Sequence, residues 1–257
     1  MASDISWKKI YDDTKMGEHD FSKEAFILSA KQIKESCQDF KKTAEKEVRI
    51  LCKQDSREDR PQVFKDKDLF ILPKHNGEYY IIQGEGYMDI PDITTPIKEY
   101  QSHLDFELKS SQVGDSEMQH LDFAYANSLV RTFMNDPSLV LTIRGRKYTP
   151  EFSFATNGIT LTVDSVQTEV DAGYEGIDSI VLIEAKNSNT TNTIIRQLYY
   201  PFRQWKENTG KTVYPMFFEK RNIDGENIYY MWQYEFVDPN DYNSIRLVKA
   251  ERYRIVR

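Results

Sequence analysis

Cysteine and histidine are scarce in this sequence of 257 residues. The two cysteines, Cys37 and Cys52, cannot form the multi-bridge framework of a small secreted domain, and they are not spaced as zinc ligands. The four histidines form no cluster at ligand spacing either. The sequence therefore predicts reduced thiols and argues against a zinc centre.

Long apolar runs are also missing. No segment approaches the ~20 consecutive apolar residues that a membrane-spanning helix needs. Residues 1–7 lack the basic stretch followed by an apolar stretch that begins a secretory signal. We therefore expect a cytoplasmic protein. Internal repeats and low-complexity tracts are absent as well, which excludes repeat architectures.

The composition that is present is that of a globular protein. Hydrophobic residues make up 39%, aromatic residues 13% and charged residues 29% of the chain, enough for one large domain or two small ones. The net charge is −7. This value does not exclude a nucleic-acid partner, because the local field at a cleft matters more than the total charge.

Hydrophobic periodicity predicts an α/β fold, a mixed sheet flanked by helices, with an additional α+β region at the N-terminus. The predicted helices cover residues 22–47, with Ser22 as N-cap, 115–134 and 191–207, the last interrupted by Pro201. Strands are predicted at residues 68–73, 78–83, 139–143, 151–154, 159–163, 166–172, 180–184, 213–218 and 228–236. We place the N-terminal region at residues 1–105, where it could take part in recognising a target, and a second domain at 106–257.

The most apolar predicted strand, residues 180–184, ends in the sequence Glu184-Ala185-Lys186. Glu and Lys are rarely buried without a partner. Side chains two apart on a strand share a face, so Glu184 and Lys186 should project the same way. A carboxylate that holds a divalent cation beside a cation that orients water is the pair that phosphodiester hydrolysis needs. A surface ion pair at a strand end is the simpler alternative.

A second carboxylate is expected from the preceding strand. If residues 175–178 form the turn of an antiparallel hairpin, Glu169 lies opposite Glu184 and Asp171 lies opposite Leu182. Both upstream carboxylates would then share one face with Glu184. A register slip by one residue would move both of them to the other face.

Asp171, followed after 12 residues by Glu184-Ala185-Lys186, resembles the signature of PD-(D/E)XK nucleases. The segment from residue 167 to 205 also resembles a group of type II restriction endonucleases in that superfamily. The resemblance implies a Mg²⁺ site, open also to Mn²⁺, formed by Asp171, Glu184 and the carbonyl of Ala185, with Lys186 beside the attacking water. It implies further roles for Gln197 in the following helix and for an auxiliary acid in the preceding helix, where Glu117 lies.

One position departs from the signature, because Val170 stands where the pattern has proline. Glu169 therefore remains a rival to Asp171 as the upstream catalytic and metal-binding acid.

The resemblance implies a type II restriction endonuclease that cuts double-stranded DNA at a specific sequence and leaves 5′-phosphates. Such an enzyme would act as a homodimer at a short symmetric site, and a cognate DNA methyltransferase would act on the same site. Two alternatives remain open: a structure-specific repair nuclease, and a DNA-binding module of the same fold that does not cut. The sequence contains no P-loop, which argues against a nuclease coupled to a motor.

Basic side chains near these motifs are candidates for DNA-phosphate contacts. They lie in a predicted turn and in the predicted helix after the motif: Arg144, Arg146, Lys147, Arg196 and Arg203. Solvated charges and surface ion pairs are the alternative interpretation of the same residues.

Overall fold

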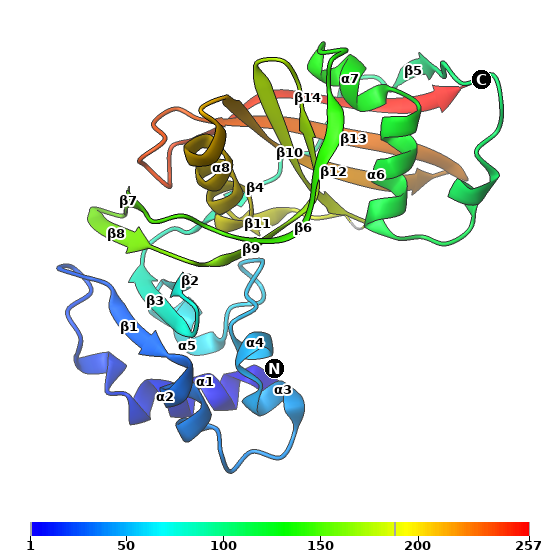
Figure 1. The fold of residues 1–257 in the computed structure, drawn as a ribbon. Coiled ribbons are helices and arrows are strands. Elements are labelled where there is room, and N and C mark those ends of the chain that lie inside the picture. The colour runs from blue at the N-terminus through cyan, green and yellow to red at the C-terminus, as the bar shows by residue number, and fades with distance from the viewer. Residues whose placement is uncertain (1, 188, 257) are drawn as a thin grey trace.

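A large mixed sheet flanked by helices dominates the structure, a computed structural model that describes residues 2–187 and 189–256. Its strands run in the order β5-β14-β13-β12-β10-β9-β6. The N-terminal elements form a smaller lobe beside this sheet, drawn in blue and cyan in Figure 1. Among the described residues, no helix is both long and apolar enough to cross a bilayer. The mixed α/β class predicted from periodicity is confirmed.

The smaller lobe is a three-stranded antiparallel sheet, in the order β1-β3-β2, packed against short helices. Trp7 is fully buried in its core, and its indole N–H donates to the carbonyl of Leu51 at 3.1 Å. Its elements are α1 (Ala2–Asp13), η1 (Met16–Glu18), β1 (Phe26–Ser29), α2 (Ala30–Ser36), α3 (Thr43–Lys46), α4 (Val48–Leu51), α5 (Gln62–Asp66), β2 (Leu69–His75) and β3 (Glu78–Gln83).

The helix predicted over residues 22–47 is wrong in its first turns and in its length. Phe26 lies opposite Ile81, so this segment begins as strand β1. The helix starts only after Ser29, whose hydroxyl accepts from the backbone N–H of Gln32 at 3.2 Å while the Gln32 side chain accepts from the Ser29 N–H at 2.9 Å. This capping box fixes the N-terminus of α2 seven residues after the predicted cap at Ser22. The hairpin of residues 68–83 is confirmed as β2 and β3.

The larger region contains the remaining elements. They are β4 (Tyr87–Asp89), β5 (Lys98–Gln101), η2 (Lys109–Gln112), α6 (Glu117–Ala126), α7 (Leu129–Met134), β6 (Val140–Tyr148), β7 (Phe152–Thr156), β8 (Ile159–Val163), β9 (Gln167–Glu175), β10 (Ser179–Lys186), β11 (Asn192–Ile194), α8 (Arg196–Thr209), β12 (Thr212–Ile223), β13 (Glu226–Phe236) and β14 (Ile245–Val256).

Strand β10 is buried on both faces, because helices cover the large sheet on each side. Ile180 and Leu182 pack in the core that contains α8, whereas Val181 and Ile183 pack in the core that contains α6 and α7. The period-2 alternation of a strand explains this division. Glu184 and Lys186 have the parity of Leu182, so they project toward the side of the sheet that carries α8.

Two predicted helices differ in detail from the observed ones. The helix predicted at 115–134 is divided into α6 and α7, since Ser128 adopts a left-handed conformation with φ 63° between them. The helix predicted at 191–207 begins only at Arg196, after the short strand β11. Pro201 lies inside α8, where its missing N–H removes one intrahelical bond.

Residues 87–101 pair with the larger region. β4 pairs with β11, and β5 pairs in parallel with β14 at the edge of the large sheet. The end of the three-stranded sheet at Gln83 therefore precedes the first strand that joins the larger region. The domain division at residue 105 stays a prediction.

Candidate functional site

The hairpin formed by β9 and β10 carries the predicted motif, but its register differs from the expected one by two residues. Leu182 lies opposite Gly173, not opposite Asp171, and Ile183 lies opposite Ala172. The turn lies one residue later than predicted, because Glu175 still belongs to β9 and pairs with Ile180, and the N–H of Gly176 donates to the carbonyl of Ser179 at 2.8 Å. Since a shift of two residues preserves the faces of a strand, Asp171 comes nearer to Glu184 than the predicted register allowed.

A bulge in β9 aims the Asp171 side chain. Val170 packs in the core with α8, whereas Ala172, two residues later, packs in the core with α6. Ile143 of β6 pairs with Gly173 of β9, and Gly145 pairs with Val170. Between these two pairs β9 therefore has one residue more than β6, which is the bulge. Bulges re-aim side chains and are frequent beside active sites. Here the Asp171 carboxylate accepts a hydrogen bond from the backbone N–H of Ala185 at 2.7 Å.

The Glu184 carboxylate is buried, with 8% exposure, and its Oε1 accepts two hydrogen bonds. Lys186 Nζ donates at 2.6 Å, and the side-chain amide of Gln197 donates from α8 at 2.9 Å. The hydroxyl of Thr193 in turn donates to Gln197 Oε1 at 2.5 Å, which fixes the orientation of the amide. The structure therefore brings together four residues that the sequence singled out: Asp171, Glu184, Lys186 and Gln197.

Burial dominates the electrostatics of these groups. It raises the pKa of Glu184 to about 7, against the lowering effect of Lys186 and together with the charge of Asp171. Burial also raises the pKa of Asp171, although the N–H of Ala185 opposes the shift. For Lys186, burial alone would lower the pKa, but the charge and hydrogen bond of Glu184, together with the charges of Glu117 and Asp171, outweigh it and the pKa is raised. The buried Glu184 and the half-buried Asp171 both have raised pKa values, and a bound cation would stabilise the ionised form of each carboxyl group.

The donor set fits a hard divalent cation of the Mg²⁺ type. The described residues contain no cluster of three or more His, Cys, Asp or Glu side chains arranged around one point. Mg²⁺ nevertheless needs only one or two carboxylates, since it keeps several waters and binds substrate phosphates. The N–H of Ala185 points toward Asp171. In an extended strand the carbonyl of the same residue points to the same side, so it is available as a third oxygen beside the two carboxylates.

Comparison with known proteins assigns the chain to a family without assigning an activity. A model described as "Domain of unknown function (DUF6997)" matches residues 82–254. The chain belongs to this family. A second model, "Domain of unknown function (DUF6996)", matches residues 4–81. Neither the curated proteins nor the solved structures contain a match. In this member of the DUF6997 family, the two matched segments meet inside β3, close to the end of the three-stranded sheet.

The acidic pair, Asp171 and Glu184, opens into a cleft of about 690 Å³ between the smaller lobe and the larger region. This central cleft is lined by residues of both parts of the chain. They are Arg49, Ile50, Cys52, Lys53, Asp55, Ile71, Pro73, Tyr79, Arg146, Gln167, Thr168, Glu169, Asp171, Glu184, Lys186, Arg196, Gln197, Tyr200 and Pro201. Cationic side chains from both parts of the chain line the cleft together with its carboxylates, and they could attract an anionic substrate to the acidic pair.

The five basic residues predicted to contact DNA are separated by the fold. Arg146 and Arg196 line the central cleft. Lys147 is exposed on β6, next to Arg146. Arg144 is half-buried and forms an ion pair with Asp122 on α6. The structure does not bring Arg203 to the cleft. Its guanidinium is 5% exposed and donates at 3.0 Å to the carbonyls of Ser153 and Pro239.

The two other predicted acids occupy different surroundings. Glu169 is 59% exposed and pairs with Arg146 at 3.2 Å, in the cleft but without a hydrogen bond to the motif. Glu117 is the first residue of α6, and its charge contributes to the raised pKa of Lys186. The auxiliary acid expected in the preceding helix therefore lies near the motif.

Sequence reasoning missed the cleft residues of the smaller lobe, above all Arg49, Lys53 and Asp55. Asp55 Oδ1 lies 3.5 Å from a guanidinium nitrogen of Arg196, and its charge raises the pKa of Glu184. These residues belong to a polar, charged stretch that reads as an ordinary surface loop. Only the long-range pairing of this stretch with β11 reveals its position, and no periodicity in the sequence encodes that pairing.

Proposed function

We propose that this protein is a Mg²⁺-dependent nuclease with a PD-(D/E)XK core. More specifically, we propose a type II restriction endonuclease that hydrolyses double-stranded DNA at a defined sequence and leaves 5′-phosphates. The observation that carries the proposal is the buried Glu184 carboxylate. It is hydrogen-bonded by Lys186 and lies with Asp171 in a cleft lined by cationic side chains. A buried acid–lysine pair at the end of a central strand has little structural value, because the desolvation of both charges offsets their attraction.

Each residue of the site has a distinct role in this proposal. In this proposal Asp171, Glu184 and the carbonyl of Ala185 would hold the cation, which would supply positive charge near the phosphoryl oxygens and would acidify a water. Lys186 Nζ donates to the attacking water and orients it toward phosphorus. Gln197 holds the Glu184 carboxylate in place from α8. Arg146 and Arg196 bind the neighbouring phosphates of the strand.

The assembly and location belong to the same proposal. One active site per chain cuts one strand, so a double-strand break at a symmetric sequence requires a homodimer. A cognate DNA methyltransferase would modify the same sequence in the host, and both proteins would act in the cytoplasm. Sedimentation of the protein with and without a DNA duplex measures the oligomeric state.

The deciding experiment is digestion of a plasmid of known sequence with Mg²⁺, with Mn²⁺ and with excess EDTA, followed by mapping of the ends. Lys186→Ala is the matched control for a contaminating nuclease. Discrete fragments with uniform 5′-phosphate ends, seen only with metal and the unaltered chain, are expected. Random or end-initiated products would favour a structure-specific repair enzyme, and binding without cleavage would favour a non-cutting module. Full activity in EDTA would exclude the proposed site.

A further inference from the structure

Residues 49–55 of the smaller lobe, here called the cleft segment, form one wall of the central cleft. Five of them line it: Arg49, Ile50, Cys52, Lys53 and Asp55. The other lining residues come from β2 and β3 of the same lobe and from β6, β9, β10 and α8 of the larger region. The acidic pair therefore opens into a cleft whose walls come from both parts of the chain.

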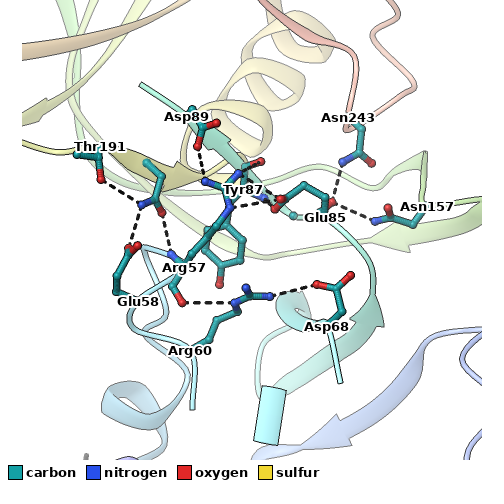
Figure 2. A network of polar contacts seen from close by, with 12 residues as sticks. Arg57, Glu58, Arg60, Asp68, Glu85, Tyr87, Asp89, Asn157, Thr191 and Asn243 are labelled. Carbon is teal, nitrogen blue, oxygen red and sulfur yellow. Dashed lines mark hydrogen bonds and ion pairs between the residues drawn. The ribbon is translucent and has the colours of Figure 1, made fainter. Parts of the chain in front are cut away.

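Arg57 and Glu58, just after the cleft segment, are held to the larger region by a network of polar contacts (Figure 2). The backbone N–H of Arg57 donates to the side chain of Asn192 at 2.8 Å, and that side chain donates to Glu58 at 2.9 Å. The Arg57 guanidinium also reaches Glu85 at 3.1 Å and pairs with Asp89 at the end of β4.

Two further contacts extend this anchor to the cleft segment itself. The carbonyl of Asp55 accepts from the N–H of Ile194 at 2.8 Å, and the carbonyl of Gln54 accepts from the Tyr87 hydroxyl at 3.1 Å. Ile194 ends β11, directly before the turn of α8 that carries Arg196 and Gln197. The segment is therefore fixed to β11, which directly precedes α8, the helix whose Gln197 positions the Glu184 carboxylate.

The cationic side chains of the cleft segment form no close ion pair within the described residues. Arg49 is exposed and has no ion pair within the described residues. The Lys53 side chain is 74% exposed, and its ammonium lies 3.7 Å from Asp55, a distance typical of a loose contact. Exposed cations beside the carboxyl groups of the cleft reduce the electrostatic repulsion that an anion meets when it enters the cleft.

We propose that the cleft segment binds the phosphate backbone of the DNA strand that enters the acidic site, with Arg49 and Lys53 as the contacting cations. This inference rests on the proposed nuclease function and adds DNA-backbone contacts from the smaller lobe to those of Arg146 and Arg196. Phosphate contacts fix the register of the duplex but carry no sequence information. Loss of these two cations therefore weakens binding to all DNA sequences by a similar factor.

Asp55 opposes this binding in the free protein, since it pairs with both Arg196 and Lys53. A phosphate that enters the cleft competes with the Asp55 carboxylate for these two cations. Replacing the carboxylate with an amide of the same size leaves the backbone anchor to Ile194 intact. Asp55→Asn should therefore bind DNA more tightly than the unaltered chain, the reverse of the effect of removing Arg49 and Lys53.

The test measures the affinity of the full-length chain for a fluorescent DNA duplex in EDTA at several salt concentrations. Arg49→Ala/Lys53→Ala should bind roughly tenfold or more weakly, with a salt slope smaller by about 2, because two phosphate contacts are lost. The matched control is Lys31→Ala/Lys34→Ala, which removes the same charge from exposed positions of α2 outside the cleft. Thermal unfolding checks that each variant is folded.

The outcomes separate the inference from the function on which it rests. The inference is supported if Arg49→Ala/Lys53→Ala binds DNA more weakly, if the control variant binds it as the unaltered chain does, and if Asp55→Asn binds it more tightly. Equal affinities and slopes for the two double variants, with cleavage and binding by the unaltered chain, overturn it and leave the nuclease proposal standing. If the unaltered chain neither binds nor cuts DNA with any divalent metal, the nuclease proposal fails and the inference falls with it.

Discussion

The side-chain amide of Gln197 donates a hydrogen bond to Glu184 Oε1 at 2.9 Å, so a residue of α8 orients a carboxylate at the end of β10. The Thr193 hydroxyl holds the amide oxygen of Gln197 at 2.5 Å, which leaves the NH₂ group directed at Glu184. Partners of this kind support the ligands of metal sites from outside.

Removal of this support should weaken metal binding. Gln197→Ala leaves one oxygen of a buried carboxylate without its amide donor, and we expect about 10–100-fold weaker Mn²⁺ binding by calorimetry. Gln204→Ala is the matched control, because Gln204 also lies on α8 but is buried and bonds Thr168 and the carbonyl of Tyr148. Equal Mn²⁺ affinities for the two variants would show that Gln197 has only a structural role.

The upstream acid is tested by charge-removing substitutions. Asp171→Asn, Glu184→Ala and Lys186→Ala should each lower the cleavage rate by several orders of magnitude while circular dichroism stays unchanged. Glu169→Gln should be milder, because its carboxylate is 59% exposed and pairs with Arg146 rather than with the motif. An inactive Glu169→Gln together with an active Asp171→Asn would reverse the assignment of the upstream ligand.

Metal affinity should depend on pH around neutrality. The cation binds the ionised form of Glu184, whose pKa is raised to about 7 by burial, so a proton must leave before the metal enters. We expect Mn²⁺ to bind more weakly at pH 5.5 than at pH 8, with a proton released to the buffer. Titration in buffers of different ionisation enthalpy measures that release, and a pH-independent affinity would contradict the assignment.

The metal-free protein should lose stability as the pH rises. Because the folded pKa of Glu184 is about 7 and its ordinary value is 4.5, the protonated carboxyl stabilises the fold fully below about pH 4.5. This contribution is lost as the pH rises through 7, and it amounts to on the order of 3 kcal/mol. The raised pKa of Asp171 acts in the same direction.

Urea unfolding in EDTA at pH 5 and pH 8 checks this dependence. Glu184→Gln should not show the loss of stability that ionisation of Glu184 causes between pH 5 and pH 8. This variant should therefore be more stable than the unaltered chain at pH 8. Glu169→Gln removes the same charge at an exposed position and should follow the unaltered chain. A Glu184→Gln variant that loses stability in parallel with the unaltered chain would show that Glu184 is not buried as a protonated acid.

Local pattern was enough to predict the strands that carry the motif. The run from Ile180 to Ile183 is apolar throughout, because helices cover both faces of β10 and positions buried on both faces favour apolar residues. The alternation along the strand also placed Glu184 and Lys186 on one face. The pairing register was wrong by two residues, because the turn closes between Glu175 and Ser179. The bulge near Asp171 was not foreseen, since no residue type marks it.

The smaller lobe shows what a periodic pattern misses. Phe26 and Ile27 fit a helical repeat, yet they form β1 because β3 offers an open edge for pairing. Such tertiary pairing overrides a weak helical signal. The contribution of Asp55 to the cleft was equally hidden, since it depends on a backbone bond to Ile194, far along the chain. Residues 245–256 form β14, next to the edge strand β5, although their many charges gave no strand signal.

Arg203 and Arg146 should respond to truncation in opposite ways. Arg203 is buried, and it donates to two carbonyls and to Glu207, so Arg203→Ala leaves buried acceptors unpaired. We expect a loss of about 2–4 kcal/mol in the free energy of unfolding, and unchanged DNA affinity in the fraction that remains folded. Arg146 is 58% exposed and forms one surface ion pair, so Arg146→Ala should cost under about 1 kcal/mol while weakening DNA binding. Denaturant unfolding and DNA titration of both variants measure the two effects separately. A stable Arg203→Ala with impaired DNA binding would return Arg203 to the DNA interface that the sequence predicted.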